Sequence, residues 1–166
     1  MTLGFDTLVP EQILDAIECS GLQCTGELLA LNSYENRVYR AALEDGQRVV
    51  AKFYRPGRWS DNAILEEHDY ALRLRERELD VVAPMTFDED TLLHIDGFRL
   101  AIYPCVGGRW PALEDEALLK QIGRLVRACI SPQSDSVSTT VRLLMWCGSG
   151  GRLATPFWKA ISCRPS

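Results

Sequence analysis

Apolar and polar residues recur with two different periods along the chain, and each period predicts a different kind of element. Between Pro10 and Cys19 the apolar residues return every three or four positions, which favours a helix. Five shorter runs are rich in β-branched and aromatic residues with a period nearer two, and these predict strands. The strands are expected at 28–31, 38–43, 48–55, 91–95 and 98–103.

Two Asp-Gly pairs predict where the sheet turns back on itself. Asp45-Gly46 lies between the second and third expected strands, and Asp96-Gly97 lies between the last two. Asp-Gly is a favoured pair in tight β-hairpins. From Ser60 to Glu76 the chain has a capping residue at its start and arginines near its end, which is typical of a helix. We therefore expect an α+β fold, with an antiparallel sheet of about five strands and a helix after the third.

The last periodic segment is a predicted helix over residues 113–126. Its apolar stripe consists of Leu118, Leu119, Ile122 and Leu125. After Arg127 no periodicity continues, so the remaining residues are predicted to form an irregular or disordered tail.

Lys52 is a charged residue among the apolar residues of an expected strand, and this position needs a chemical explanation. It lies inside the third expected strand, and burying an unpaired lysine costs several kcal/mol. Either it lies on the solvent face of the strand or it has an anionic partner. In the following helix Glu67 shares a face with Ile64 and Ala71, whereas Glu66 lies about 100° away from that face. Glu67 is therefore the acid expected to enter the interior and to pair with Lys52.

Composition narrows the class of protein. A net charge of −5 argues against a nucleic-acid binder that relies on neutralising phosphates. No apolar run approaches the length of a membrane-spanning helix, and the first residues lack the features of a signal peptide, so we expect a cytoplasmic location. The six cysteines form no C-x-x-C pair and stand away from both histidines; we expect reduced thiols and no metal site.

Charge is divided unevenly between the two parts of the chain. Residues 128–166 hold one acidic and four basic residues, which leaves 22 acidic and 14 basic residues in 1–127. The first part therefore has a net charge of −8 and the tail one of +3. The tail and the first 127 residues therefore do not resemble parts of one continuous protein sequence.

Several strings resemble the bacterial stress response kinase A family, and they occur in the family's order. These strings are LNSYENRVY at 31–39, VAKFYRPGRW at 50–59, ILEEH at 64–68, VAP at 82–84 and PCVGGR at 104–109. The resemblance covers about residues 5–127. The family consists of cytoplasmic serine/threonine protein kinases with the fold of aminoglycoside phosphotransferases and choline kinases. The resemblance thus implies a protein kinase-like N-terminal lobe.

The resemblance also implies roles toward ATP. Ser33 would lie at the nucleotide in place of a glycine-rich loop, Lys52 would contact the α- and β-phosphates, and Glu67 would orient Lys52. The interlobe hinge, where backbone groups meet adenine, would be formed by Pro104, Cys105 and Val106. From the residues alone, the turn around Ser33 is more typical of an ordinary polar hairpin tip.

The family pattern divides the chain into a small lobe (1–104), a hinge with the first helix of a large lobe (105–127) and an aberrant tail (128–166). The family places its catalytic aspartate and Mg²⁺ ligands in a large-lobe H-G-D-x-x-x-x-N segment. This chain contains no such segment, and its two histidines both fall in the small lobe. We therefore assign no catalytic and no metal-binding residue, although the intact family uses ATP with Mg²⁺.

The tail suggests a frameshift. With GC-rich codons TGC ATC AGC assumed for Cys129 to Ser131, a shifted frame reads CAT CAG, which encodes the His-Gln that the family has here. We hypothesise a single-base frameshift near Arg127; a tail that evolved as such is the alternative.

Three functional interpretations follow. The first is the ATP-binding lobe of a serine/threonine protein kinase, inactive as this fragment; the others are a non-enzymatic regulatory or docking module and a pseudogene product. No nucleic-acid or membrane partner is expected, and the residues do not indicate the protein substrate. The intact family is expected to be monomeric, whereas a lobe cut at the hinge would expose apolar surface and aggregate.

Overall fold

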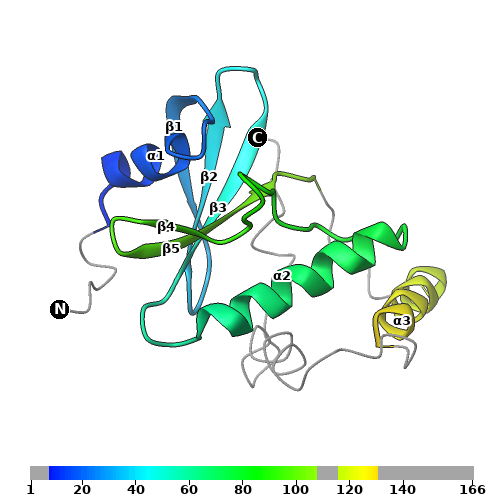
Figure 1. Ribbon diagram of the computed structural model, residues 1–166. Coiled ribbons are helices and arrows are strands. Elements are labelled where there is room, and N and C mark those ends of the chain that lie inside the picture. The colour runs from blue at the N-terminus through cyan, green and yellow to red at the C-terminus, as the bar shows by residue number, and fades with distance from the viewer. Residues whose placement is uncertain (1–7, 108–115, 131–166) are drawn as a thin grey trace.

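The computed structural model describes residues 8–107 and 116–130 of the chain. Its elements are α1 (Pro10–Glu18), β1 (Cys24–Leu31), β2 (Arg37–Leu43), β3 (Arg48–Tyr54), α2 (Asp61–Glu76), β4 (Leu93–Ile95), β5 (Phe98–Pro104) and α3 (Glu116–Ile130). Figure 1 shows one sheet with helices on both sides, which confirms the expected α+β class. The expected start of the last helix (113–115) and the tail from 131 onward lie outside the described residues, and residues 128–130, expected to be irregular, are helical. The frameshift near Arg127 stays a hypothesis.

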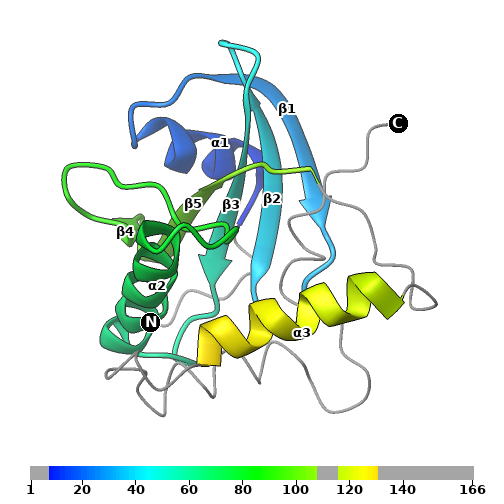
Figure 2. The same cartoon turned by 90° about the vertical axis from the view of Figure 1, so that its right-hand side faces the viewer.

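The five strands form one antiparallel sheet in the order β1-β2-β3-β5-β4 (Figure 2). β3 lies at its centre, so that Lys52 is opposite Val38 on β2 and Ala101 on β5. The predicted hairpin between β4 and β5 is confirmed. Asp96 and Gly97 have φ values of +50° and +79°, the left-handed pair that a tight primed turn requires.

The two-residue period of β3 gives the sheet two differently used faces. Val49, Ala51 and Phe53 are buried on one face, where they pack with α1. Val50 and Tyr54 are buried on the other, where they pack with Ile64 of α2. We call these the α1 face and the α2 face.

Three element bounds differ from the prediction by more than one residue. β1 begins at Cys24 rather than at residue 28, because its register shifts between Cys24 and Leu28, around Gly26 with φ +90°, and such an irregular stretch lacks a clean strand pattern. β4 begins at Leu93, two residues late, since Thr91 is buried and bonded to a side chain of α2. α3 continues past the predicted end at 126, because the next residues include good helix formers.

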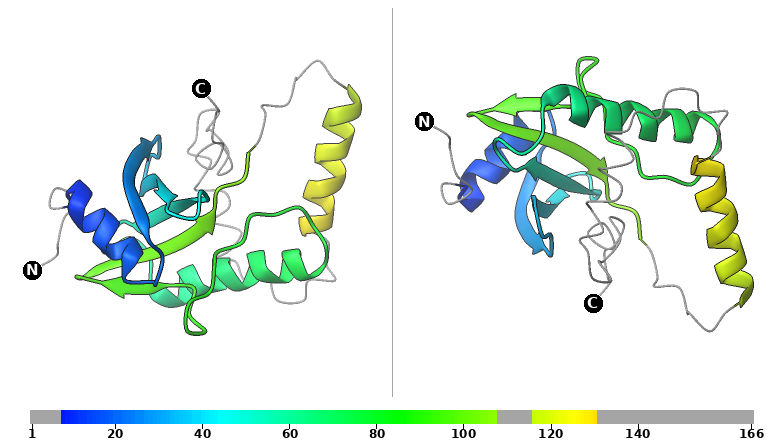
Figure 3. Two further views of the ribbon diagram at one scale, coloured as in Figure 1. Left: turned by 90° about the horizontal axis from the view of Figure 1, so that it is seen from above. Right: turned by 90° about the horizontal axis from the view of Figure 1, so that it is seen from below.

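α3 lies off the sheet, near the C-terminal half of α2 (Figure 3). Four of its apolar side chains are exposed: Leu119, Ile122, Leu125 and Val126. Within the described ranges, no helix has the length and apolar character needed to span a bilayer.

Candidate functional site

Lys52 extends from the centre of β3 onto the α2 face and is only 6% exposed. Its Nζ lies 3.0 Å from Oε1 of Glu67 on α2. Glu66 is exposed, so the helix phase selected the correct one of the two adjacent acids. α2 begins where the Ser60 side chain accepts a hydrogen bond from the Ala63 amide at 3.3 Å, and this cap fixes the phase that turns Glu67 inward.

The Lys52–Glu67 pair is not explained by stability alone. The two side chains are 7% and 19% exposed, so both have given up most of their hydration. A well-packed apolar pair at a buried position is often as stable as an ion pair or more so. A lysine ammonium that a carboxylate holds in one place can, however, bind an anion such as a phosphate group. This geometry therefore favours a binding role.

Apolar residues lie beside the ammonium on the same face. Leu31, Val38 and Ala101 share one cross-strand row with Lys52, and directly opposed residues of antiparallel strands point to the same side. Val50 belongs to the same buried cluster as Val38, and the partly buried Cys105 packs against it. The α2 face thus places an apolar surface next to a fixed positive charge.

The edge of the sheet at the end of β5 offers backbone hydrogen-bonding groups. The Cys105 N–H donates to the carbonyl of Arg48 on β3 at 3.1 Å. The carbonyl and the N–H of one trans peptide point in opposite directions, so the carbonyl of Pro104 is directed away from β3. β5 ends at Pro104, and Val106 lies two residues beyond it. This end of β5 therefore presents a carbonyl acceptor, and the backbone N–H of Val106 follows two residues later.

Ser33 lies half-buried in the loop between β1 and β2. That loop is tied to the segment after β3 at two points. Glu35 forms an ion pair with Arg58, and Oδ1 of Asn36 accepts a hydrogen bond from the Arg55 amide at 3.2 Å. The loop is therefore anchored near the end of the lysine strand, while a contact of Ser33 with a ligand stays a prediction.

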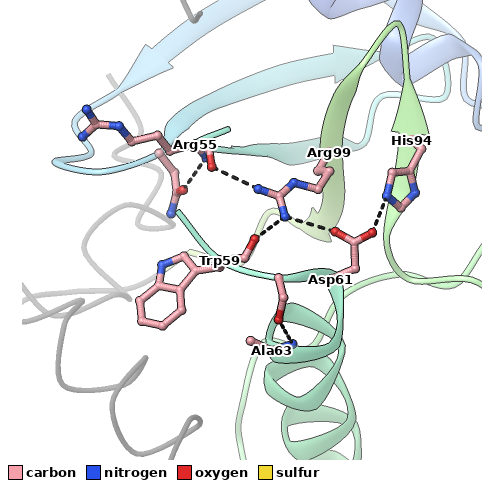
Figure 4. Close-up of polar contacts among 8 residues, drawn as sticks. Arg55, Trp59, Asp61, Ala63, His94 and Arg99 are labelled. Carbon is pink, nitrogen blue, oxygen red and sulfur yellow. Dashed lines mark hydrogen bonds and ion pairs between the residues drawn. The ribbon is translucent and has the colours of Figure 1, made fainter. Parts of the chain in front are cut away.

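The first turn of α2 is fastened to β5 by Arg99 (Figure 4). The Arg99 guanidinium donates to Oδ1 of Asp61 at 3.0 Å, to the carbonyl of Arg55 at 3.1 Å and to the carbonyl of Trp59. His94 on β4 contacts Oδ2 of Asp61 at 3.0 Å. The hydrogen bond from Arg99, assisted by His94, lowers the pKa of Asp61. These contacts hold the start of the helix that carries Glu67.

Behind the ion pair lies a buried polar cluster that the sequence did not predict, formed by Tyr54, His68, Thr91 and Tyr103. The Tyr54 hydroxyl is 2.8 Å from Nε2 of His68, and Nδ1 of His68 is 2.8 Å from the Thr91 hydroxyl. The Tyr103 hydroxyl lies 3.3 Å from that of Tyr54 and 3.4 Å from Nε2 of His68. We call this the Tyr54–His68 cluster. His68 follows Ile64 by four residues, and this spacing was the available signal for its burial.

Burial sets the charge state of the cluster. It lowers the pKa of His68 to about 4, against the opposing effect of Glu67. It also raises the pKa values of Tyr54 and Tyr103 well above their usual range. Near neutral pH the imidazole and both phenols are therefore uncharged.

The cysteines only partly follow expectation. Cys19 and Cys24 are free thiols, as predicted, but Cys105 is disulfide-bonded, and the expectation of reduced thiols is wrong for it. In the part of the chain that the structure describes, no group of three or more His, Cys, Asp or Glu side chains could hold a metal ion.

The sequence matches a family model described as the phosphotransferase enzyme family over residues 27–133. Stress response kinase A of Escherichia coli O157:H7 is 46% identical to this chain over 120 residues. The serine/threonine protein kinase RdoA of Salmonella typhimurium is 47% identical over the same length. Both alignments cover 72% of this chain and 37% of the relative. The chain thus spans little more than a third of the length of these relatives.

Among solved structures, the fold is similar to that of the amicoumacin kinase hAmiN, which was determined in complex with AMP-PNP, Ca²⁺ and Ami. The TM-score is 0.51 at 23% sequence identity, over 60% of this chain and 32% of the kinase chain. The described sheet and helices therefore have the architecture of one part of a phosphotransferase.

Proposed function

The chain belongs to the phosphotransferase enzyme family, and we propose that its described part is the lobe that binds ATP for phosphoryl transfer. The observation that carries this proposal is the buried Lys52–Glu67 pair at 3.0 Å. In protein kinases a strand lysine, held by a glutamate of the following helix, binds the phosphates of ATP. Lys52 would contact the α- and β-phosphates, and Glu67 would orient its ammonium.

The neighbouring groups support the same ligand. Adenine is flat and apolar with a donor and an acceptor on one edge, and the apolar row with Leu31 and Val38 would cover its ring. The Pro104 carbonyl, which is directed away from β3, and the Val106 N–H two residues later would bind its edge. We place the small lobe at 1–104 and its hinge from Cys105 onward. Ser33 would contact the phosphates from its anchored loop.

We further propose that the intact protein of this type transfers the γ-phosphoryl group of ATP to serine or threonine residues of proteins. The 46–47% identity to relatives named as kinases supports this reaction. The 166-residue chain has no H-G-D-x-x-x-x-N segment to supply a base and Mg²⁺ ligands. We expect this polypeptide to bind ATP without transferring phosphate.

Titration calorimetry of the 166-residue chain with ATP tests the binding site. Lys52→Met and Glu67→Gln should each raise the dissociation constant at least about tenfold, the loss expected for one charge-assisted phosphate contact. Glu66→Gln is the matched control, because it removes the same charge from the exposed neighbouring position and should change the constant less than about twofold. Equal effects at positions 66 and 67, or wild-type binding by Lys52→Met, would refute the assignment.

The hinge assignment has its own matched pair. Val106→Pro removes the backbone N–H that would bind adenine, whereas Val106→Ala keeps it. We expect Val106→Pro to weaken ATP binding about tenfold relative to Val106→Ala, the worth of one hydrogen bond. Inorganic triphosphate, which lacks adenine, should bind both variants alike. A matching loss for triphosphate would show that the proline acts on the fold and not on adenine.

A further inference from the structure

Tyr54 contacts Lys52 directly and is connected to Glu67 through the neighbouring residue His68. It lies two residues after Lys52 on β3, so both side chains point to the α2 face. The Lys52 ammonium lies 4.4 Å from the centre of the Tyr54 ring. An ammonium over an aromatic face is attracted by the ring, and the attraction is greatest where water is excluded. Tyr54 is 2% exposed, which meets that condition.

The other end of Tyr54 reaches the helix that carries the glutamate. Its hydroxyl is 2.8 Å from Nε2 of His68, the residue next to Glu67 on α2. A neutral imidazole has one donor and one acceptor nitrogen, and both are used here, by Tyr54 and by Thr91 at 2.8 Å. Within the described residues no buried side-chain nitrogen or oxygen lacks a hydrogen-bond partner. A hydrogen-bonded bridge thus runs from β3 through α2 to the segment before β4.

We propose that Tyr54 is a positioning residue for the phosphate-binding lysine and acts in two separable ways. Its ring face holds the Lys52 ammonium, and its hydroxyl, through His68, holds α2 at the distance from which Glu67 reaches that ammonium. The expected effect of Tyr54 on ATP binding rests on the proposed function. The ammonium is thereby held between a carboxylate and a ring face, and ATP meets a lysine that is already in place.

The alternative is that Tyr54 merely fills the core. Two variants separate the roles. Tyr54→Phe keeps the ring and removes the hydroxyl, whereas Tyr54→Leu removes both. Tyr103→Phe is the matched control, because it deletes a hydroxyl from the same Tyr54–His68 cluster while the ring beneath Lys52 stays.

The first readout needs no nucleotide. In NMR spectra of the 166-residue chain with labelled lysine, protons beside the Lys52 ammonium should be shifted upfield by the Tyr54 ring. The shift should persist in Tyr54→Phe and Tyr103→Phe and disappear in Tyr54→Leu, an effect that a loss of core packing alone does not produce. An unshifted Lys52 in the wild type would overturn the ring half of the proposal, even if Tyr54→Leu does not fold.

The second readout measures the hydroxyl. Hydrogen exchange of the α2 amides around Glu67 should be faster in Tyr54→Phe than in Tyr103→Phe. The dissociation constant for ATP should rise about threefold in Tyr54→Phe and about tenfold in Tyr54→Leu. Unchanged exchange in Tyr54→Phe would overturn the hydroxyl half. Failure of the wild type to bind ATP would refute the proposed function instead, while the lysine shift and the exchange rates still decide the role of Tyr54.

Discussion

We predict that the folded protein loses stability in mild acid because His68 is buried in a neutral form. Its imidazole is 1% exposed and lies in a cluster of neutral hydroxyl groups, with Lys52 and Glu67 as the charged groups nearby. Burial lowers its pKa from 6.5 to about 4, and this outweighs the attraction of Glu67 for the imidazolium. In the unfolded chain the same imidazole titrates near its ordinary value.

The sign follows from proton counting. Between pH 6.5 and 4 the unfolded chain binds a proton at His68 that the folded chain does not bind, so the free energy of unfolding falls as the pH falls through this range. Above about pH 6.5 the contribution is complete. With one pKa unit equal to about 1.4 kcal/mol, the loss is about 1 kcal/mol at pH 5.5 and between about 2 and 3 kcal/mol at pH 4.5.

Urea denaturation at pH 7.5, 5.5 and 4.5, followed by tryptophan fluorescence, measures this loss. His68→Gln is the comparison variant, because its amide can still bond to Tyr54 but does not titrate. Carboxylates titrate in both proteins and cancel in the difference between them. The wild type should lose about 2 to 3 kcal/mol more than His68→Gln between pH 7.5 and 4.5. The reasoning is refuted if the two proteins lose stability in parallel.

Two further predictions concern α2 and α3. Arg99→Gln removes the guanidinium that joins β5 to Asp61 and should lower the free energy of unfolding by about 1 to 3 kcal/mol, whereas the exposed His94→Gln should cost less than about 0.5 kcal/mol in the same urea assay. Equal losses would show that Arg99 is not the main anchor. The double substitution Ile122→Gln with Leu125→Gln should reduce self-association in sedimentation velocity without lowering the melting temperature, because both side chains are exposed. Unchanged self-association would show that another surface of the protein mediates it.

The sequence predicted best those features that periodicity and local turn chemistry control. The succession of strands and helices along the chain, the Asp96-Gly97 hairpin and the inward phase of Glu67 depend on neighbouring residues and were all found. The start of β1 was misplaced, because the register shift near Gly26 breaks the two-residue pattern on which a strand prediction depends.

The Tyr54–His68 cluster could not be predicted in the same way. Its members come from β3, α2, β5 and the segment before β4, so no window of sequence contains the contacts. Tyrosine and histidine also occur at surfaces as readily as in partly buried positions. Only the pairing of β3 with β5 brings Tyr54 and Tyr103 to the same face.

The two faces of β3 have a consequence for how this protein can change over generations. Residues that set the packing of α1, such as Ala51 and Phe53, alternate with those that serve the proposed ligand, such as Lys52 and Tyr54. A lineage can therefore accumulate compensating substitutions on the α1 face while the ligand-facing residues stay as they are. Sequence variation would then be high on the α1 face and low on the ligand-facing side, at alternating positions of β3.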